Sequence, residues 1–442
     1  MSGIPLIYDL YPSRPLEGWD KAREMRRKLF WDIWKGKEKG KILVQGVNCF
    51  ATAFLAGLGE VVMAGIGPNF GRITSNIELL KECNALAAQH GLSQNTCASM
   101  RMTVGALYKG IFYQAPSGEQ MKPDLCMDIS LCPHQVKGNH IFQDFYGVPH
   151  LVIEVPAWFE GNKQHHYDFL VTQFHNSVEW LEKTFNTKYD DDKLIEATYD
   201  EWDVAVTYAR CADLLKAIPA PIDSARFYPF LTPILRAGRH SKDALMILQI
   251  LHEELKDRVR DGIAVEPRER ARIFHEGNMP YFWGGMYRIT RKYGAVLVGG
   301  RHLFGFSSAF KIHEDGTWEV PQTLRERGVE LRTREDAFRS IAELMLDYSP
   351  AVSGFQYPSM GREAVKVAQD WHADGIIMHI DRGCRSMSAA CLEVKADLEK
   401  AGIPVLAYSG NTADPRDFNQ AQVESQIDTF MARLGLTKLS DE

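Results

Sequence analysis

PDLCMDISLCPHQVKGNHIFQDFYGVPHLVIEVP at residues 123–156 and ADGIIMHIDRGCRSMSAACLEVKADLEKAGIPVLAY at residues 373–408 contain the same order of segments. Each begins with an apolar run typical of a strand. A cysteine, a helical pattern, Gly-Val-Pro or Gly-Ile-Pro, and a second apolar run follow. Strands that alternate with helices are typical of parallel sheets with crossover helices. We therefore predict an α/β protein with two similar parallel-sheet domains that face each other across a cleft.

The rest of the chain extends this pattern on either side of the two stretches. KILVQGVN at 41–48 is strand-like, whereas residues 167–216 and 240–276 are rich in helix formers. A chain of 442 residues is too long for one compact core. We expect an N-terminal arm and helix over 1–40, a first α/β domain over 41–165, a mainly helical region over 166–285 and a second α/β domain over 286–442.

Composition and charge exclude several classes of protein. The formal net charge of −6 argues against a nucleic-acid partner, which requires a basic surface. The N-terminus has no apolar core of signal-peptide length, and the sequence contains no uncharged apolar run of membrane-spanning length. We therefore expect a cytoplasmic, soluble protein without a membrane partner. The eight cysteines are then unlikely to form a disulfide framework.

Three cysteines lie in loops that precede predicted helices. Cys132 and Cys384 occupy the same place in the two repeated stretches, after a strand and before a helix, which is where open α/β sheets bind ligands. Cys97 follows the loop HGLSQNT and precedes another helix start. Free N–H groups at helix N-termini stabilise thiolates and anionic groups. Cys49 is a rival candidate, and core roles are expected for Cys83, Cys126, Cys211 and Cys391.

Spacing alone does not assign a ligand to these cysteines. The sequence has no CxxC motif and no ferredoxin-type run of cysteines. Three widely spaced loop cysteines are compatible with buried thiols as well as with metal ligands. Zinc would require a fourth nitrogen or sulfur ligand nearby.

Four longer motifs stand out: SQNTCASMR at 93–101, PDLCMDISLCPHQVKG at 123–138, MHIDRGCRSMS at 378–388 and GNTADPRDFNQAQVESQIDTFMARLG at 410–435. They are similar to motifs of the 2-hydroxyacyl-CoA dehydratase and benzoyl-CoA reductase family. The sequence most resembles the larger cluster-bearing subunit, of the B or O type, of the ATP-dependent benzoyl-CoA reductases. Many members of the family have an arginine at the position of Gln426, and the segment VNCFATAF differs from the commoner dehydratase form. Both departures favour the reductase branch.

The resemblance implies a cofactor and a set of partners. In the family, three cysteines at positions that match Cys97, Cys132 and Cys384 hold one 4Fe–4S cluster, and one iron lacks a protein ligand. A homologous second cluster-bearing subunit, ATP-hydrolysing activator subunits with a bridging cluster, and ferredoxin are the implied partners. ATP is then used by a partner and not by this chain, which has no G-x-x-x-x-G-K-[ST] loop.

The implied function is that of an iron–sulfur subunit of an aromatic acyl-CoA reductase. Its substrate would be benzoyl-CoA or a ring-substituted relative, reduced to a cyclic diene thioester. A subunit of a 2-hydroxyacyl-CoA dehydratase and a non-catalytic electron-relay subunit are alternatives within the same resemblance. A metal-free α/β ligand-binding protein is a further alternative.

Few other residues are candidates for catalysis or cofactor binding. His134 and Asp381 lie beside the cysteine loops and are weak candidates for the proton donor. Arg385 follows Cys384 and could contact a cluster sulfide or a phosphate of coenzyme A. The aromatic run MPYFWGGMY at 279–287 could stack on an aromatic ring, although core packing is the simpler interpretation. Further candidates for the coenzyme A phosphates are Arg236, Arg239, Arg325 and Arg327.

Overall fold

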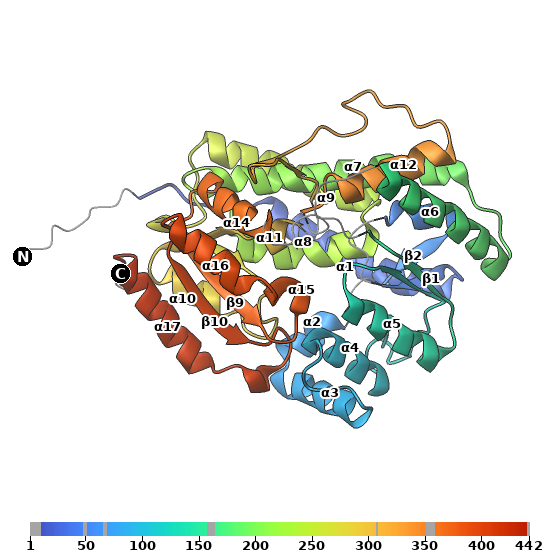
Figure 1. Ribbon diagram of the computed structural model, residues 1–442, viewed down its shortest axis with the longest axis horizontal. Coiled ribbons are helices and arrows are strands. Elements are labelled where there is room, and N and C mark those ends of the chain that lie inside the picture. The colour runs from blue at the N-terminus through green and yellow to red at the C-terminus, as the bar shows by residue number, and fades with distance from the viewer. Residues whose placement is uncertain are drawn as a thin grey trace, which may run out of the picture.

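The computed structural model describes residues 10–46, 51–64, 69–156, 164–305, 308–350 and 359–439. Two parallel four-stranded sheets lie side by side, surrounded by helices (Figure 1). The predicted α/β class with two parallel-sheet units is therefore confirmed. Among the helices of these ranges, none has both the length and the apolar character needed to cross a lipid bilayer.

The first sheet has the strand order β2-β1-β3-β4, and all its pairings are parallel. Apolar side chains cover both faces, which is typical of parallel sheets in α/β proteins. The helices α3, α4 and α5 cover one face, and α6 and α12 cover the other. The elements are α1 (Gly18–Glu38), β1 (Ile42–Gln45), η1 (Ala53–Leu58), β2 (Val61–Met63), α2 (Phe70–Ser75), α3 (Ile77–Gln89), α4 (Ala98–Tyr108), β3 (Leu125–Ile129), α5 (Pro133–Tyr146), β4 (His150–Ile153), α6 (Gln164–Phe185) and α12 (Arg334–Leu346).

The second sheet has the strand order β10-β9-β5-β6, again entirely parallel. Helices α10 and α17 pack on one face, and α8, α14 and α16 pack on the other. Its elements are β5 (Ala271–Glu276), α10 (Gly285–Arg291), β6 (Ala295–Gly299), α11 (Arg301–Gly305), α14 (Ser359–Asp370), β9 (Gly375–Asp381), α15 (Arg385–Ser388), α16 (Cys391–Lys400), β10 (Val405–Gly410), η3 (Pro415–Asp417) and α17 (Gln420–Arg433).

Long helices connect the two sheets. Helix α8 contacts the edge strand β2 of the first sheet and the edge strand β6 of the second. Helix α7 packs against α9, α12 and η1 and buries the indole of Trp202 completely. The remaining elements are α7 (Asp191–Asp213), η2 (Leu214–Lys216), α8 (Ser224–Gly238), α9 (Lys242–Arg260) and the hairpin strands β7 (Lys311–Ile312) and β8 (Trp318–Glu319).

Strand β5 lies inside the range 166–285, which was expected to be mainly helical. It pairs with β6 and β9, so the second sheet begins at Ala271 and not after residue 285. Its sequence ARIFHE contains Arg272, His275 and Glu276, and all three side chains are buried. Buried polar residues remove the apolar run that predicts a strand, and this concealed β5 in the sequence. The domain boundaries themselves stay a prediction.

The crossing of α3 and α4 predicts one large effect on stability. A Cβ atom on Gly105 would lie 1.8 Å from the carbonyl oxygen of Cys83, so the two helix backbones touch there. We expect Gly105→Ala to lower the free energy of unfolding by roughly 1–3 kcal/mol, because a packed core must shift to admit the methyl group. Chemical denaturation measures this change.

Gly71→Ala is the matched control for this substitution. Gly71 lies in helix α2 with no atom within 4 Å of an added Cβ. It should leave stability unchanged or raise it slightly, because alanine favours helices. Equal stability of both variants would contradict the close approach at Gly105.

Candidate functional site

Cys97, Cys132 and Cys384 line one cavity of about 200 Å³. Cys97 is the N-cap residue of α4, and Cys132 is the N-cap residue of α5. Cys384 ends the loop after β9 and precedes α15, in the second α/β unit. The structure thus brings the three predicted cysteines together from both units. Each lies at the start of a helix, as the sequence indicated.

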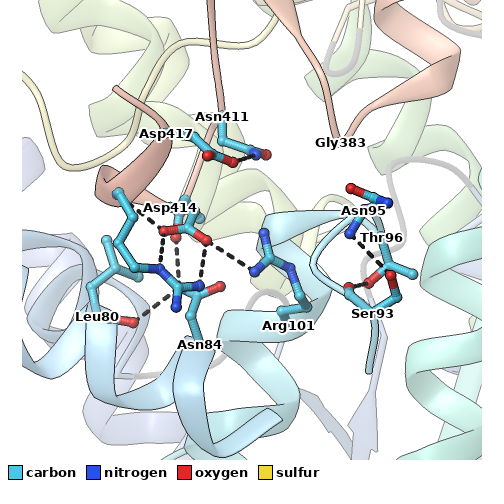
Figure 2. A network of polar contacts seen from close by, with 12 residues as sticks. Leu80, Asn84, Ser93, Asn95, Thr96, Arg101, Gly383, Asn411, Asp414 and Asp417 are labelled. Atoms are coloured by element: carbon cyan, nitrogen blue, oxygen red, sulfur yellow. Dashed lines mark hydrogen bonds and ion pairs between the residues drawn. The ribbon is translucent and has the colours of Figure 1, made fainter. Parts of the chain in front are cut away.

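The loop of Cys384 packs directly on the loop of Cys97. A Cβ atom on Gly383 would lie 3.3 Å from the backbone nitrogen of Ala98 and from the carbonyl oxygen of Thr96. It would also lie 2.8 Å from Oδ1 of Asn411. Figure 2 shows the ribbon at Gly383 close to the turn that carries Asn95 and Thr96. Glycine at position 383 therefore permits the contact that sets the spacing of Cys97 and Cys384.

A buried ion pair joins the two units beside these loops (Figure 2). Arg101, one turn after Cys97 in α4, donates from Nη1 to Oδ2 of Asp414 over 2.9 Å. Arg416 donates to both oxygens of the same carboxylate, over 2.9 and 2.7 Å. Asn84 of α3 donates to the carbonyl oxygen of Ala413 over 2.8 Å. We call the contact of Arg101 with Asp414 the interunit ion pair.

The sulfur atoms lie in an apolar setting with directed N–H groups. Burial raises the pKa of the Cys97 thiol to about 11, and N–H groups of Met100 and Ser99 act against this rise. Burial also raises the pKa of Cys384, against the N–H of Met387. The neighbouring thiols disfavour one another's ionisation in both cases. Three thiolates would therefore require a bound cation to offset their charge.

The described residues contain no group of three or more His, Cys, Asp or Glu side chains close enough to bind a single metal ion. A mononuclear zinc ion requires sulfur ligands at about 2.3 Å. In an iron–sulfur cluster each thiolate binds a different iron, so that the sulfurs stand further apart. Three cysteine thiols around one cavity are a donor set of the kind that holds such a cluster.

Polar and aromatic side chains of the first unit complete the cavity wall. Gln135 and Asn139 line it, and each donates to Oδ1 of Asp128 over 2.7 Å. His150 contacts the other oxygen of Asp128, also at 2.7 Å. Because these amides are fixed by a buried carboxylate, they present a rigid polar edge to the cavity. Aromatic rings form much of the remaining wall: Phe70, Phe112, Phe142 and Tyr281.

The weak candidates for catalysis occupy different positions. His134 lines the cavity beside Cys132. Asp381 does not line it, and its Oδ1 accepts the N–H of Gly383 over 3.0 Å while Oδ2 accepts the hydroxyl of Thr412. Its contacts therefore hold the Cys384 loop in place and do not support a role as proton donor. The side chain of Arg385 lies outside the described part of the structure.

The other predicted residues can be placed in the same way. Cys83, Cys126, Cys211 and Cys391 are buried in the core, as expected, whereas Cys49 lies outside the described residues. From the aromatic run 279–287, Tyr281 reaches the cavity, where its ring meets that of Phe70 edge-on at 5.1 Å between centroids. Phe282 and Trp283 instead pack against Phe418.

Three of the four arginines proposed for coenzyme A phosphates lie in ion pairs and do not line the cavity. Arg239 is buried beside Glu201, at 3.9 Å between Nε and Oε1. Arg325 pairs with Asp203, and Arg327 pairs with Glu343. The side chain of Arg236 lies outside the described residues. The contacts of these arginines give a phosphate-binding role no support.

Sequence reasoning missed His302, which also lines the cavity. It follows β6 at the carboxyl edge of the second sheet, after the run AVLVGG. That position is equivalent to the loops of the cysteines and was the available signal. The preceding residue, Arg301, forms a buried ion pair with Glu276 over 2.7 Å.

Glu363 lies beside this ion pair and predicts a pH dependence of stability. Burial raises the pKa of its carboxyl to about 7, although Arg301 and Trp318 act in the opposite direction. Because the folded pKa lies above the unfolded value of about 4.3, folding favours the protonated form. Stability should therefore fall as pH rises from about 4 to 7. Glu363→Gln should remove this fall and be more stable at pH 8 by roughly 1–3 kcal/mol.

Chemical denaturation of both proteins between about pH 5 and 8 measures the difference. Glu393→Gln is the control, since Glu393 is exposed on α16. It should keep the pH dependence of the unchanged protein. A Glu363→Gln variant with that same pH dependence would contradict the assignment.

Comparisons with known proteins come from a family match and from individual relatives. Residues 64–434 match the family described as 2-hydroxyglutaryl-CoA dehydratase, D-component. The chain is 22% identical over 344 residues to the (R)-phenyllactyl-CoA dehydratase alpha subunit of Clostridium sporogenes, with 76% of each chain covered. It is 23% identical over 354 residues to a benzoyl-CoA reductase subunit of Thauera aromatica, with 78% of each covered.

A third relative is the (R)-2-hydroxyglutaryl-CoA dehydratase subunit alpha of Acidaminococcus fermentans. It is 22% identical over 308 residues, which cover 69% of this chain and 58% of that subunit. All three relatives are named as subunits of larger enzymes. Dehydratase and reductase subunits are thus similar to this chain to the same degree. The comparisons therefore identify the family of this chain but do not identify which of the two reactions it takes part in.

Proposed function

The chain belongs to the 2-hydroxyglutaryl-CoA dehydratase D-component family, and from this premise we propose that it is the iron–sulfur subunit of an enzyme that reduces an aromatic acyl-CoA. The substrate would be benzoyl-CoA or a ring-substituted relative, and the product a cyclic diene thioester. The observation that carries the proposal is the meeting of Cys97, Cys132 and Cys384 around one cavity with aromatic walls.

The three thiols would hold one 4Fe–4S cluster. When bound, such a centre supplies electrons one at a time at a potential that its surroundings set. The N–H groups of Met100 and Met387, which point at the sulfurs of Cys97 and Cys384, would donate to the cluster's sulfur ligands. Hydrogen bonds to sulfur are one of the means by which proteins tune such a centre.

The chain's own side chains would place the acyl group beside that centre. Phe70 and Tyr281 meet edge-on at one side of the cavity, and an aromatic ring can add a third edge or face contact there. Such contacts contribute about 0.5–1.5 kcal/mol beyond the burial of area. The fixed amides of Gln135 and Asn139 would donate hydrogen bonds to polar atoms of the thioester. Apolar walls also exclude water, which would protonate reactive intermediates.

Partner subunits complete the proposed enzyme. The relatives are each named as one subunit of an enzyme, which implies assembly with other chains. We expect a homologous second cluster-bearing subunit and an activator that hydrolyses ATP and accepts electrons from ferredoxin. The cluster of this chain would then receive electrons from the activator, and this chain alone would not reduce a thioester.

A 2-hydroxyacyl-CoA dehydratase is the second candidate function. Two of the three relatives described above are named as dehydratase subunits, which favours this function. Their identity to this chain, 22%, is nearly the same as the 23% of the reductase subunit. The same cavity could hold a 2-hydroxyacyl thioester. In that reaction the electron returns in each cycle and the products are an enoyl thioester and water.

One anaerobic assay separates the two functions. The chain is combined with its second subunit, the activator, ATP and a strong reductant, and then offered benzoyl-CoA or a 2-hydroxyacyl-CoA. We expect ATP-dependent loss of benzoyl-CoA and formation of the cyclic diene thioester. Dehydration of the hydroxyacyl thioester without loss of benzoyl-CoA would assign the chain to the dehydratases. Turnover by the chain alone without ATP would contradict the expected partners.

A further inference from the structure

His302 lies at the wall of the cysteine cavity and is 6% exposed. The other titratable side chains that line this cavity are the three cysteines, His134 and Tyr281. Both candidate reactions on an acyl thioester require a proton at a carbon or at a leaving hydroxyl group. Imidazole is the side chain whose ordinary pKa suits proton transfer near neutral pH. The contacts of His302 therefore decide whether it can transfer a proton to the bound acyl group.

The backbone around His302 is firmly held. It lies in the short helix α11, immediately after β6. Arg301 anchors this helix through its buried ion pair with Glu276, in which Nη2 and Oε2 are 2.7 Å apart and Nε and Oε1 are 3.1 Å apart. On the α8 side, the ring of Tyr228 lies 6.0 Å from that of His302 between centroids. The imidazole thus has a fixed place at the wall of the cavity.

A row of buried polar rings extends from His302 across the second sheet. Helix α11, which carries His302, packs against β5, which carries His275, and β5 pairs with β9, which carries His379. His379 in turn stacks on Tyr408 of β10, with 4.8 Å between ring centroids. The strand order β10-β9-β5-β6 therefore places four polar rings in sequence, of which only His302 lines the cavity.

The atoms of this row are unusual for a protein core. Within the described residues, neither ring nitrogen of His275 has a well-aligned hydrogen-bond partner, and its ring interacts only loosely with the backbone of Gly277. Nε2 of His379 and the hydroxyl of Tyr408 likewise have no partner in this part of the chain. Nδ1 of His379 donates to the carbonyl oxygen of Asn278, which itself lines the cavity. Buried polar groups are nearly always paired, and a catalytic role is one of the explanations for an exception.

We infer that His302 transfers a proton to the acyl thioester bound in the cysteine cavity, and that His275 and His379 are positioning residues behind it. This inference deepens the proposed function, since it rests on acyl-thioester chemistry in that cavity. In the step, the N–H bond of protonated His302 breaks and its electron pair stays on nitrogen. A C–H bond forms on the reduced ring, or an O–H bond forms on the departing hydroxyl group. Bulk solvent returns a proton to the imidazole after the product has left the cavity and before the next turnover.

The test uses the assembled complex with His302→Gln and His302→Gly. We expect kcat to fall about 10²–10⁴-fold, the range for loss of a general acid, with KM changed much less. Iron content should stay at the level of the unchanged protein. Added imidazole should restore part of the activity of His302→Gly in proportion to its concentration. His313→Gln is the control, because His313 is an exposed residue paired with Glu319, and it should keep full activity without an effect of imidazole.

The positioning role has its own readout. His275→Asn should shift the pH profile of kcat and leave iron content unchanged, whereas a purely structural role would change stability alone. Retained kcat in His302→Gly, or no effect of imidazole on a variant that still binds iron and acyl-CoA, would overturn the inference.

A second measurement separates this inference from the proposed function. Binding of benzoyl-CoA and of a 2-hydroxyacyl-CoA is followed by calorimetry in two buffers of different ionisation enthalpy. Proton uptake by the unchanged complex that disappears in His302→Gln supports the inference, whichever thioester is turned over. Equal proton uptake in both proteins overturns it. Dehydration in place of reduction rejects the reductase function and leaves the result for His302 standing.

Discussion

Cys132→Ala should lose most of the iron that the unchanged protein retains after anaerobic purification. Removal of one of the three thiolates would leave two irons of the proposed cluster without a protein ligand, which weakens the hold of the protein on it. The same result is expected for Cys97→Ala and Cys384→Ala, because all three sulfurs line one cavity. Iron and sulfide content per chain, together with the brown colour of the cluster, measure the effect.

Cys211→Ala and Cys126→Ala are the matched controls for this loss. Both cysteines are fully buried and do not line the cavity. Their replacement should keep the iron and reduce the free energy of unfolding modestly, because a small buried group is removed. Full iron retention in Cys132→Ala would refute the ligand assignment, and iron loss in Cys211→Ala would point to general instability instead.

Asp414→Ala should destabilise the protein by about 3–5 kcal/mol, the usual effect of removing one partner of a buried ion pair. Its partner Arg101 has a fully buried side chain, and Nε and Nη2 of that guanidinium have no hydrogen bond within the described residues. Loss of Asp414 would leave this positive charge in the core without its counter-charge. Arg101 lies one turn from Cys97, and Asp414 lies four residues beyond β10. The contact between the two units should therefore loosen at the loops that carry the cysteines.

Chemical denaturation measures the stability of this variant. The iron retained per folded chain measures how far the contact between the two units has loosened at the cysteine loops. Lys395→Ala is the control, because Lys395 forms an exposed pair with Glu399 on α16. Such surface pairs contribute about 0–1 kcal/mol. A variant Asp414→Ala as stable as Lys395→Ala would contradict the importance of the interunit ion pair. If Asp414→Ala is destabilised but keeps the same iron content per folded chain, the interunit ion pair contributes to folding and does not position the cysteine loops.

Low pH should act on the same contact. Burial raises the pKa of the Asp414 carboxyl, but hydrogen bonds from Arg416 and Arg101 outweigh it, and the pKa lies below its ordinary value. A carboxylate with a depressed folded pKa stabilises the protein above its unfolded pKa of about 3.9. This contribution is lost as pH falls through the folded value. The interunit ion pair is therefore intact at neutral pH.

The sequence by itself determined the fold class and singled out the three cysteines that meet at the cavity. The repeated order of strand, cysteine, helix and strand predicts parallel sheets because crossover helices are the usual way to join parallel strands. Cys132 and Cys384 stand out because a loop after a parallel strand has a fixed place at the carboxyl edge of the sheet. Both depend on local patterns along the chain, and such patterns can be recognised without knowing which segments meet in space.

Tertiary structure alone decided which residues meet across the two units. Gly383 touches the Cys97 loop, and Arg101 pairs with Asp414, which lies 313 residues away. No local pattern encodes such contacts. Strand β5 was hidden for a related reason, because its buried residues Arg272 and Glu276 are stabilised by partners elsewhere in the chain and not by an apolar run. The sequence places His302 after a strand, at the carboxyl edge of the second sheet, but only the packing of that sheet against the first unit brings it to the cavity.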